Sequence, residues 1–221
     1  MRIFTNLKTN KSIQNLYNFY YSVFYFKKNI NGTQNNVIIK DNVFNKSRIK
    51  IIGNNNTIEF SENSFLNVNI FIKGNNNRIF IGKNCSLKEC TLWIEDNENS
   101  IIVNNNSSIE YNTQLATVEG KNIIIGEDCM LSSNIIIRTT DSHSITDLNG
   151  RRINFGGNVT IGKHVWIGNN VTINKNVTIG NNNIISSNSL VTKNFLQENC
   201  IIGGIPSFII KEKINWLRER I

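Results

Sequence analysis

A six-residue repeat runs from Ile161 to Leu196 and restricts the folds that this chain can adopt. Cut at each opening aliphatic residue, the segment reads IGKHVW, IGNNVT, INKNVT, IGNNNI, ISSNSL and VTKNFL. A period of six is too short for a helical repeat, but it fits a short strand followed by a corner. Three such units make one triangular coil, and successive coils stack about 4.8 Å apart, the hydrogen-bonding distance between strands. The pattern predicts an all-β solenoid, with the opening aliphatic residues in ladders inside a three-sided column.

The alternative for a chain of short strands is an antiparallel sandwich. Its strands would alternate polar and apolar residues with a period of two, and irregular turns would separate them. The six-residue spacing does not fit that pattern. Gly and Asn instead follow the opening aliphatic residues, at the expected corners. We predict positive φ angles there, because residues with little steric hindrance tolerate them best.

A looser repeat begins near Ile30 and precedes the hexads. Its runs INGTQNNVII, IIGNNNTIEF, FIKGNNNRIFI and WIEDNENSIIV each place a turn between aliphatic residues. The turn residues Gly32, Gly53, Gly74 and Asp96 are 21, 21 and 22 residues apart. We interpret each interval as one coil with slightly long corners. The Asn runs suit those corners, because Asn enters the left-handed region more easily than most residues.

Residues 138–155 interrupt the hexads with an excess of Thr, Asp, Ser, Asn and Gly. Ile125 and Ile161 are 36 residues apart, which we interpret as two coils of eighteen with a loop extruded from one corner. A polar loop on a rigid scaffold is a common place for chemistry. The loop contains His143, whose imidazole can accept a proton near neutral pH because its unperturbed pKa is about 6.5. The only other histidine, His164, occupies a hexad position that should face outward.

The two ends of the chain lack the repeat. Aromatic residues crowd residues 1–29, which we expect to cap the first coil, because solenoid ends need capping. Contact with a membrane surface is the alternative for this segment. The β-solenoid domain is expected over 30–205, and 206–221 is expected to form a short C-terminal helix. Four aliphatic residues there recur at helical spacing: Ile210, Ile214, Leu217 and Ile221.

Composition narrows the partners. The formal net charge of +8 suits either solubility or an anionic ligand. The lysines do not cluster with aromatic residues, which argues against nucleic acid, and no stretch is long and apolar enough to span a membrane. The N-terminal apolar segment makes a poor signal peptide. Four cysteines show no CxxC pair and no zinc spacing, so we expect reduced thiols in a cytoplasmic protein, without a metal.

Several motifs follow one another in the second half. The loop histidine His143 precedes a VWIG hexad at 165–168, a VTK segment at 191–193, and a G-x-P turn at 204–206 followed by Lys211. In this order they resemble the hexapeptide-repeat acyltransferases, particularly the galactoside, maltose and virginiamycin acetyltransferases and the O-acetyltransferases of capsular polysaccharide and polysialic acid. The resemblance implies a left-handed parallel β-helix, acetyl-CoA as co-substrate, and a homotrimer with active sites between neighbouring copies.

The resemblance also implies roles for single residues. It makes His143 the general base, and it places Trp166 in the channel where acyl-CoA and acceptor meet. Asn169 stands where the family offers a backbone N–H to the thioester oxygen. Gln114 matches an acceptor-binding position, and we expect Asp141 to contact the acceptor as well. Apart from the resemblance, the place of Asp141 in the loop allows it either to orient the imidazole or only to cap the loop. The positions that match contacts to CoA are Trp166, Ser187, Thr192, Lys193 and Lys211.

The chain departs from the family pattern at several positions. Asn174 and Lys175 replace the usual Pro-Gly pair, and Ser187 and Asn188 replace small residues near the pantetheine. Phe208 replaces a common basic residue, so the contacts to CoA phosphate are less well supported than the fold. The long N-terminal half does not resemble the short sugar acetyltransferases and looks more like that of an enzyme acting on large glycans.

The expected activity is acetyl-CoA-dependent O-acetylation of a bacterial surface glycan or its precursor, with sialic acid as a possible component. Three alternatives remain from the sequence. The protein could N-acetylate an amino-sugar nucleotide, acetylate an antibiotic, or bind a ligand without catalysis. Release of a thiol from acetyl-CoA separates an enzyme from a binding protein, and alkali lability separates an ester product from an amide. Acetylation of an antibiotic would require a small acceptor pocket.

Overall fold

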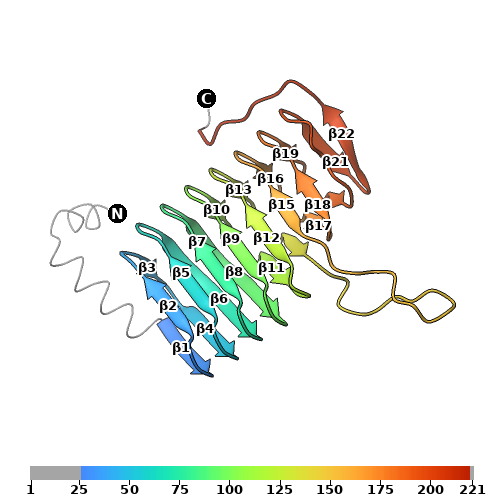
Figure 1. Ribbon diagram of the computed structural model, residues 1–221. Helices are drawn as coiled ribbons and strands as arrows, with labels where there is room; N and C mark the ends of the chain where they lie inside the picture. Colours follow the sequence, from blue (N-terminus) through green and yellow to red (C-terminus); the bar gives the residue numbers. More distant parts are fainter. Residues whose placement is uncertain (1–25, 220–221) are drawn as a thin grey trace, which may run out of the picture.

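The computed structural model describes residues 26–219, which form a three-sided column of stacked parallel strands (Figure 1). We call its sides faces A, B and C. Face A carries β1 (Phe26–Asn31), β4 (Ser47–Ile52), the second halves of β6 (Phe65–Lys73) and β8 (Ser86–Glu95), β11 (Gln114–Thr117), β14 (Ile136–Arg138), β17 (Thr172–Ile173) and β20 (Leu190–Val191). Face B carries β3 (Val43–Phe44), the first halves of β6 and β8, β10 (Ser108–Ile109), β13 (Met130–Leu131), β16 (Trp166–Ile167), β19 (Ile184–Ile185), β21 (Ile201–Gly204) and β22 (Ser207–Lys211). Face C carries β2 (Asn36–Ile39), β5 (Thr57–Phe60), β7 (Arg78–Ile81), β9 (Ser100–Val103), β12 (Asn122–Ile125), β15 (Val159–Ile161) and β18 (Val177–Ile179).

The register along face C confirms one coil per repeat. Thr57 pairs with Arg78 and Arg78 with Ser100, so coils in the first half are 21 and 22 residues long. Val159 pairs with Val177, which gives the eighteen-residue coil expected from the hexads. The longer early coils contain β6 and β8, which continue around the corner from face B to face A.

The 36-residue interval before the hexads is one coil, not two. Ile125 pairs directly with Ile161, so β12 and β15 are neighbours on face C. The interval therefore consists of one coil together with the residues of an excursion. The expectation of two coils was wrong because the extruded loop is about as long as one coil. Counting residues alone cannot distinguish a loop of that length from a second coil.

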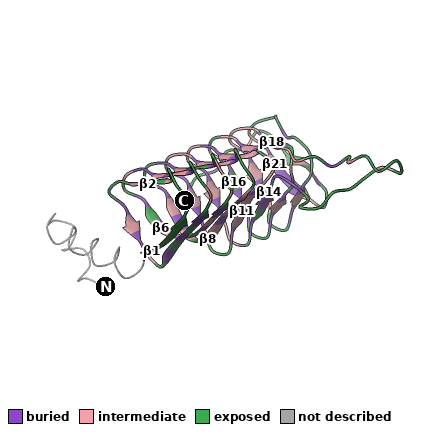
Figure 2. Cartoon of the chain, turned by 60° about the horizontal axis from the view of Figure 1, so that its bottom comes forward, coloured by how far each residue is buried: buried purple, intermediate pink, exposed green. Residues whose placement is uncertain are grey.

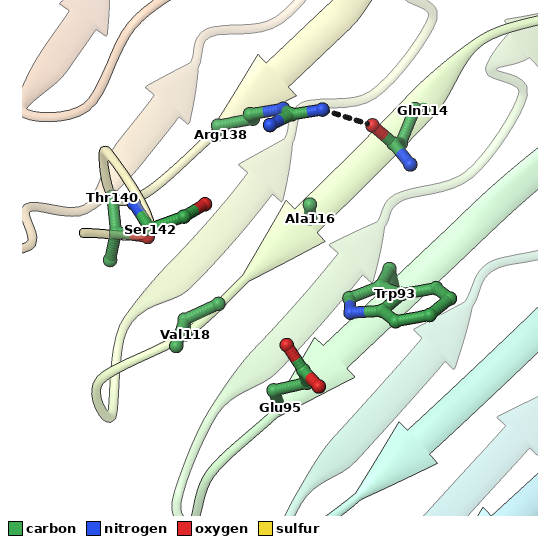
Figure 3. Close-up of a pocket in the computed structure, with 8 residues that line it drawn as sticks. All are labelled: Trp93, Glu95, Gln114, Ala116, Val118, Arg138, Thr140 and Ser142. Carbon is green, nitrogen blue, oxygen red and sulfur yellow. Dashed lines mark hydrogen bonds between the residues drawn. The ribbon is translucent and has the colours of Figure 1, made fainter.

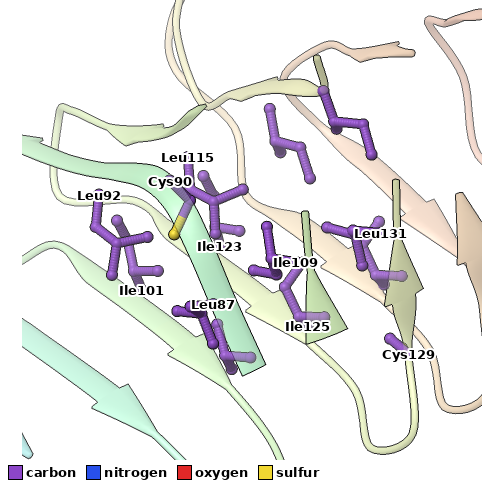
Figure 4. Close-up of a cluster of buried hydrophobic side chains, with 14 of the residues drawn as sticks. Leu87, Cys90, Leu92, Ile101, Ile109, Leu115, Ile123, Ile125, Cys129 and Leu131 are labelled. Carbon is purple, nitrogen blue, oxygen red and sulfur yellow. The ribbon is translucent and has the colours of Figure 1, made fainter. Parts of the chain in front are cut away.

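Ladders of aliphatic side chains fill the inside of the column (Figure 4). On face B, Leu87, Ile109 and Leu131 occupy the same place in successive coils, and none of them is exposed to solvent. All four cysteines are unpaired and buried among these ladders. Burial raises the pKa of Cys129 to about 11, so this thiol stays protonated at neutral pH and packs as a small apolar side chain.

The glycines of the hexads serve close packing rather than positive φ. In the five hexads over 161–190 the left-handed residue is the fourth, as in Asn170 and Asn176, and not the glycine in second place. A Cβ atom added to Gly126 would lie 2.2 Å from the carbonyl oxygen of Gly162, one coil further along. The prediction of positive φ at these glycines was therefore wrong, because the corner turns two residues later. In the earlier, looser coils, Gly53 does have positive φ, and its place also lacks room for Cβ.

The N-terminal end of the column begins earlier than expected. β1 starts at Phe26 and pairs with β4, and the ring of Phe26 stacks on that of Phe44 at 4.3 Å. The remainder of the predicted cap or membrane-contacting segment, residues 1–25, lies outside the described residues.

The predicted C-terminal helix is wrong over the residues that the structure describes. After Pro206 the chain forms β22, which pairs antiparallel with β21 at the end of face B, and residues 212–219 then run back along the column without helix. The helical spacing placed Leu217 on the buried face of a helix, but its side chain is 53% exposed. The residue that docks the tail on the column is instead Trp216, which is 5% exposed. Between residues 26 and 219 there is no helix long and apolar enough to cross a membrane.

Candidate active site

A long excursion leaves the column between β14 on face A and β15 on face C (Figure 1). It spans residues 139–158 and confirms the extruded loop predicted for 138–155. Its outer part is a hairpin, in which the N–H of Ile153 donates to the carbonyl of Ile145 at 2.9 Å. The loop points away from the column (Figures 1 and 2), so its side chains are presented beyond the surface of this copy.

Asn154 organises the base of the loop. Its side chain is nearly buried, accepts from the N–H of Ile145 at 2.7 Å and donates to the carbonyl oxygen of His143 at 2.8 Å. It also donates to the carboxylate of Asp141 at 2.8 Å. The Lys175 ammonium, from the neighbouring coil, donates to the same Asp141 oxygen and to the Asn154 carbonyl. The backbone on both sides of His143 is therefore fixed to the column.

A second anchor holds the returning strand of the hairpin. Arg152 donates to Glu119 at 2.5 Å, and the other Glu119 oxygen accepts the N–H of Gly156 at 3.0 Å. The hydrogen bond from Arg152 holds the pKa of Glu119 below its ordinary value, and the one from Lys175 does the same for Asp141. Both carboxylates are therefore ionised, and fasten the loop, at neutral pH.

The imidazole of His143 is exposed, and it has no hydrogen bond to any residue of 26–219. Asp141 does not orient it, since the hydrogen bonds of that carboxylate go to Lys175 and Asn154. Of the two roles left open for Asp141, the structure shows the loop anchor, and its contact with an acceptor stays a prediction. The structure therefore fixes the backbone at His143 and leaves its imidazole exposed, and its role as general base stays a prediction.

Asn169 and Ser187 lie one above the other at the corner between faces B and A. The N–H groups beside Asn169 are both satisfied. That of Gly168 donates to the carbonyl of Ile185 in the next coil at 2.8 Å, and that of Asn170 donates to the carbonyl of Ser133 in the preceding coil at 3.0 Å. Those of Asn169 and Ser187 themselves find no acceptor among residues 26–219. This corner therefore offers two free backbone donors to a ligand, which is the feature expected of an oxyanion site.

The remaining predicted residues divide between different sides of the column. Trp166 projects from β16 on face B, and Lys211 ends β22 on the same face. Thr192 and Lys193 are exposed at the corner between faces A and C, one coil beyond the loop anchor, and the Lys193 ammonium lies 5.6 Å from the ring centroid of Phe195. The structure therefore does not bring the predicted CoA contacts together within one copy.

His143 and Trp166 illustrate the same division. The loop emerges at the corner between faces A and C, whereas β16 lies on the opposite side, face B. The loop points outward (Figure 2), so His143 and Trp166 of one column lie on different sides of it. A site that uses both residues requires a second copy of the chain.

Gln114 lies in a pocket of about 220 Å³ on face A that the sequence did not reveal (Figure 3). Its floor is the half-buried Trp93 ring, and Arg138 forms one wall, donating to the Gln114 side chain at 2.9 Å. Ser142, the residue before His143, lies on its rim. The signal that could have located Trp93 and Arg138 is their register, since both point outward from face A in nearby coils.

The second histidine, His164, has a structural role. Its ring stacks on Trp216 at 4.1 Å, and its two nitrogens lie 2.6 Å from Asp128 and 3.1 Å from the Trp216 carbonyl oxygen. Arg218 binds the same Asp128 at 2.8 Å. Burial raises the pKa of Asp128, but hydrogen bonds from Arg218 and His164 outweigh burial and lower it overall. This cluster docks the C-terminal tail, and Trp216 lies 6.2 Å from Trp166.

The loop anchor makes one testable prediction. In Lys175→Met, trypsin should cleave at the exposed Arg151 about ten-fold faster, because a hydrogen bond to a charged group contributes roughly 1.5 kcal/mol. Lys163→Met is the matched control, since Lys163 pairs with Glu127 at 3.2 Å on the surface away from the loop. Equal cleavage of both variants would contradict the anchor.

The anchor should also depend on pH, because the pKa of Asp141 is lowered in the fold. Its stabilising effect is fully present above the ordinary pKa of a carboxyl group and is lost as the pH falls through the lowered pKa.

The part of the chain that the structure describes contains no group of three or more His, Cys, Asp or Glu side chains arranged to hold a metal ion.

Comparison with known proteins finds one matching family and several similar solved structures. The bacterial transferase hexapeptide family (six repeats) matches residues 158–193. The polysialic acid O-acetyltransferase OatWY is 35% identical, with a TM-score of 0.84, and the match covers 89% of this chain and 92% of OatWY. The polySia-specific acetyltransferase NeuO is 29% identical with a TM-score of 0.81, over 88% of this chain and 90% of NeuO.

A more distant match shows the fold alone. The N-acyltransferase AntD from Bacillus cereus is 23% identical with a TM-score of 0.52, over 74% of this chain and 82% of AntD. No curated protein matches the chain in sequence. The family match confirms the left-handed parallel β-helix expected from the sequence.

Proposed function

Because this chain belongs to the hexapeptide-repeat acyltransferases, we propose that it transfers an acetyl group from acetyl-CoA to a hydroxyl group of an acidic bacterial surface glycan or its precursor. The observation that carries the proposal is the likeness to OatWY over nearly the whole chain, the N-terminal coils included. Those coils are the part of the column that separates this chain from short sugar acetyltransferases. The loop that holds His143 with its imidazole free supplies the chemistry.

His143 acts as general base in this proposal. The acceptor hydroxyl donates a hydrogen bond to the imidazole, which takes the proton as the oxygen attacks the thioester carbonyl carbon. The carbonyl oxygen becomes an oxyanion and accepts the free N–H of Asn169. The C–S bond then breaks, the imidazolium returns its proton to the CoA thiolate, and the products are an acetyl ester and free CoA. A general base contributes roughly 10²–10⁴-fold in rate and an oxyanion donor about 10²–10³-fold.

In this proposal the CoA arm runs along the last coils of the column. Thr192 and Lys193 are exposed beyond the loop anchor, and Ser187 adds its free N–H at the neighbouring corner. Lys211, at the end of β22, is exposed at the same end of the column and suits a phosphate. We propose these residues, with Trp166, as the CoA contacts, divided between the facing sides of two copies.

A homotrimer would complete the site. The loop carries apolar side chains with no cover, and such residues in a group mark a surface that contacts another molecule. Because the hairpin points away from its own column, a neighbouring copy is the surface that it can reach, and a contact of this kind closes into a ring of three when a three-fold rotation relates the copies. Four loop residues share this exposure, from 54% to 106%: Ile145, Leu148, Ile153 and Phe155.

We also propose that the enzyme works in the cytoplasm. The four cysteines are unpaired and buried in the core, which suits a reducing compartment.

The function is tested by thiol release from acetyl-CoA with acidic and neutral glycans, both polymeric and monomeric. We expect release with an acidic polymer such as polysialic acid, and an acetylated product that mild alkali cleaves. A product resistant to mild alkali would be an amide and would identify an N-acetyltransferase. No release with any acceptor would favour a non-catalytic binding protein, and release with a small antibiotic alone would favour detoxification.

A further inference from the structure

The outer surface of face A carries a row of aromatic and cationic side chains that the catalytic proposal does not use. Lys50, Phe71, Trp93, Ala116 and Arg138 occupy the same outward position in five successive coils. Successive coils lie about 4.8 Å apart, so the row extends over roughly 20 Å along the column. We call it the face A row. It runs toward the end of β14, where the loop begins.

The centre of the row is an aromatic platform. The rings of Phe71 and Trp93 stack at 4.2 Å with an interplanar angle of 30°, and the Lys50 ammonium lies 5.6 Å from the Phe71 centroid. Trp93 is only half-buried, and it forms the floor of the pocket beside Gln114. A flat indole ring with one face open to solvent binds the apolar face of a sugar ring and leaves the sugar hydroxyls free for polar contacts.

Arg138 supplies the charge at the upper end of the row. Its side chain is exposed and held by its bond to Gln114, and no Asp or Glu within residues 26–219 forms an ion pair with it. A guanidinium group held in this way, with donors left over, suits bidentate binding of a carboxylate. Glu95, on the other side of the pocket, can accept hydrogen bonds from sugar hydroxyls.

The row leads to the chemistry. Thr140 and Ser142 complete the rim of the pocket, and the next residue is His143 (Figure 3). A second hollow, of about 260 Å³, continues from the opposite side of Gln114 along Thr91 and Ile136. The two hollows share Gln114 and lie side by side on face A, over the same three coils at the base of the loop.

We propose that the face A row is an extended binding track for an acidic glycan, in which Arg138 pairs with a sugar carboxylate and the Trp93–Phe71 platform stacks on a neighbouring sugar ring. The proposal rests on the proposed function and deepens it, because it assigns the acceptor a carboxylate and a length of several sugars. Lys50 contributes to the attraction of the polymer at the far end of the row.

The test compares Arg138→Gln and Trp93→Ala with Arg78→Gln, a control on face C whose guanidinium also lies over an aromatic ring, 5.7 Å from that of Phe80. We expect the KM for polysialic acid of defined length to rise about ten-fold or more in the first two variants. The KM for acetyl-CoA should remain unchanged, and the control should behave as the unaltered protein. If both variants keep the polymer KM of the control, the track does not exist.

Binding without turnover separates this proposal from the proposed function. Polysialic acid should bind the unaltered protein in the absence of acetyl-CoA, and Arg138→Gln should weaken that binding about ten-fold, whether or not any acetyl transfer is found. Polyglutamate of matched charge is the competitor. Polyglutamate could bind as tightly as polysialic acid, and Trp93→Ala could leave the affinity for both polymers unchanged. In that case the surface attracts any polyanion, and the proposed glycan track is wrong.

Discussion

His143→Ala should lower the rate of acetyl transfer by about 10²–10⁴-fold, the contribution of a positioned general base. The substitution removes an exposed imidazole that makes no hydrogen bond within residues 26–219, so the fold should be unchanged. Ser144→Ala, at the neighbouring exposed position, is the control and should retain full activity. The measurement is thiol release under saturating acetyl-CoA, together with the thermal unfolding midpoint. A His143→Ala enzyme with most of its activity would refute the role of this residue.

The same variant tests whether the site lies between copies. Trp166 is on the opposite side of the column from the loop, so His143→Ala and Trp166→Ala impair different halves of a shared site. When the two variants are unfolded and refolded together, about one site in four should combine an intact histidine with an intact tryptophan. Partial recovery of activity in the mixture is the expected result. If the mixture is no more active than its two components, either both residues act in the site of one copy or one of them is not part of the active site.

Gly126→Ala should destabilise the fold by about 3 kcal/mol, the upper part of the range for overpacking a rigid interior. The new Cβ would lie 2.2 Å from the carbonyl oxygen of Gly162 and 2.5 Å from its carbon. Neither backbone can retreat easily, because each coil is hydrogen-bonded to the next on both sides, as by the 2.9 Å bond from the N–H of Gly126 to Ile161. The substitution therefore interrupts the stacking of the column at the coil that carries the loop.

Gly150→Ala is the control for this prediction. Gly150 lies at the tip of the loop with φ of +80°, and a Cβ there meets no atom within 4 Å. Its replacement should cost only about 1 kcal/mol, for the positive φ. Denaturant unfolding of the two variants measures the difference. Equal losses of stability would mean that the coils can move apart at Gly126 to make room for a Cβ atom. Close packing would then not be the reason for glycine at this position.

Periodicity in the sequence predicted most of the scaffold. A ladder residue recurs every six positions, and an aliphatic side chain in each coil has no place to go except the inside of a closed column. The lengths of the early coils followed from the same argument, since Gly53 and Gly74 are one coil apart in both the sequence and the structure. The loop was visible as a break in the pattern, and a histidine inside such a break was a reasonable base. None of these inferences required distances.

The errors share one physical cause, which is that a linear pattern does not contain the third dimension. The loop was counted as a coil because both occupy about eighteen residues. The tail was expected to be helical because its apolar spacing fits a helix, whereas Trp216 docks on His164 through a contact separated by 52 residues. The hexad glycines were expected to have positive φ, but they are needed because a Cβ atom would clash with the backbone of the next coil. The sequence does not show that contact.

The sequence by itself determined that this chain forms a stacked column with one extruded histidine loop, because local periods of six leave few ways to bury aliphatic side chains. Only the tertiary structure decided which outward residues become neighbours. Trp93 and Arg138 are 45 residues apart in the chain but two coils apart on face A, and the position of the loop relative to Trp166 depends on which corner it leaves. The repeat spacing predicts the coil lengths, but only the hydrogen bonds between coils show which outward side chains pair and from which corner the loop leaves.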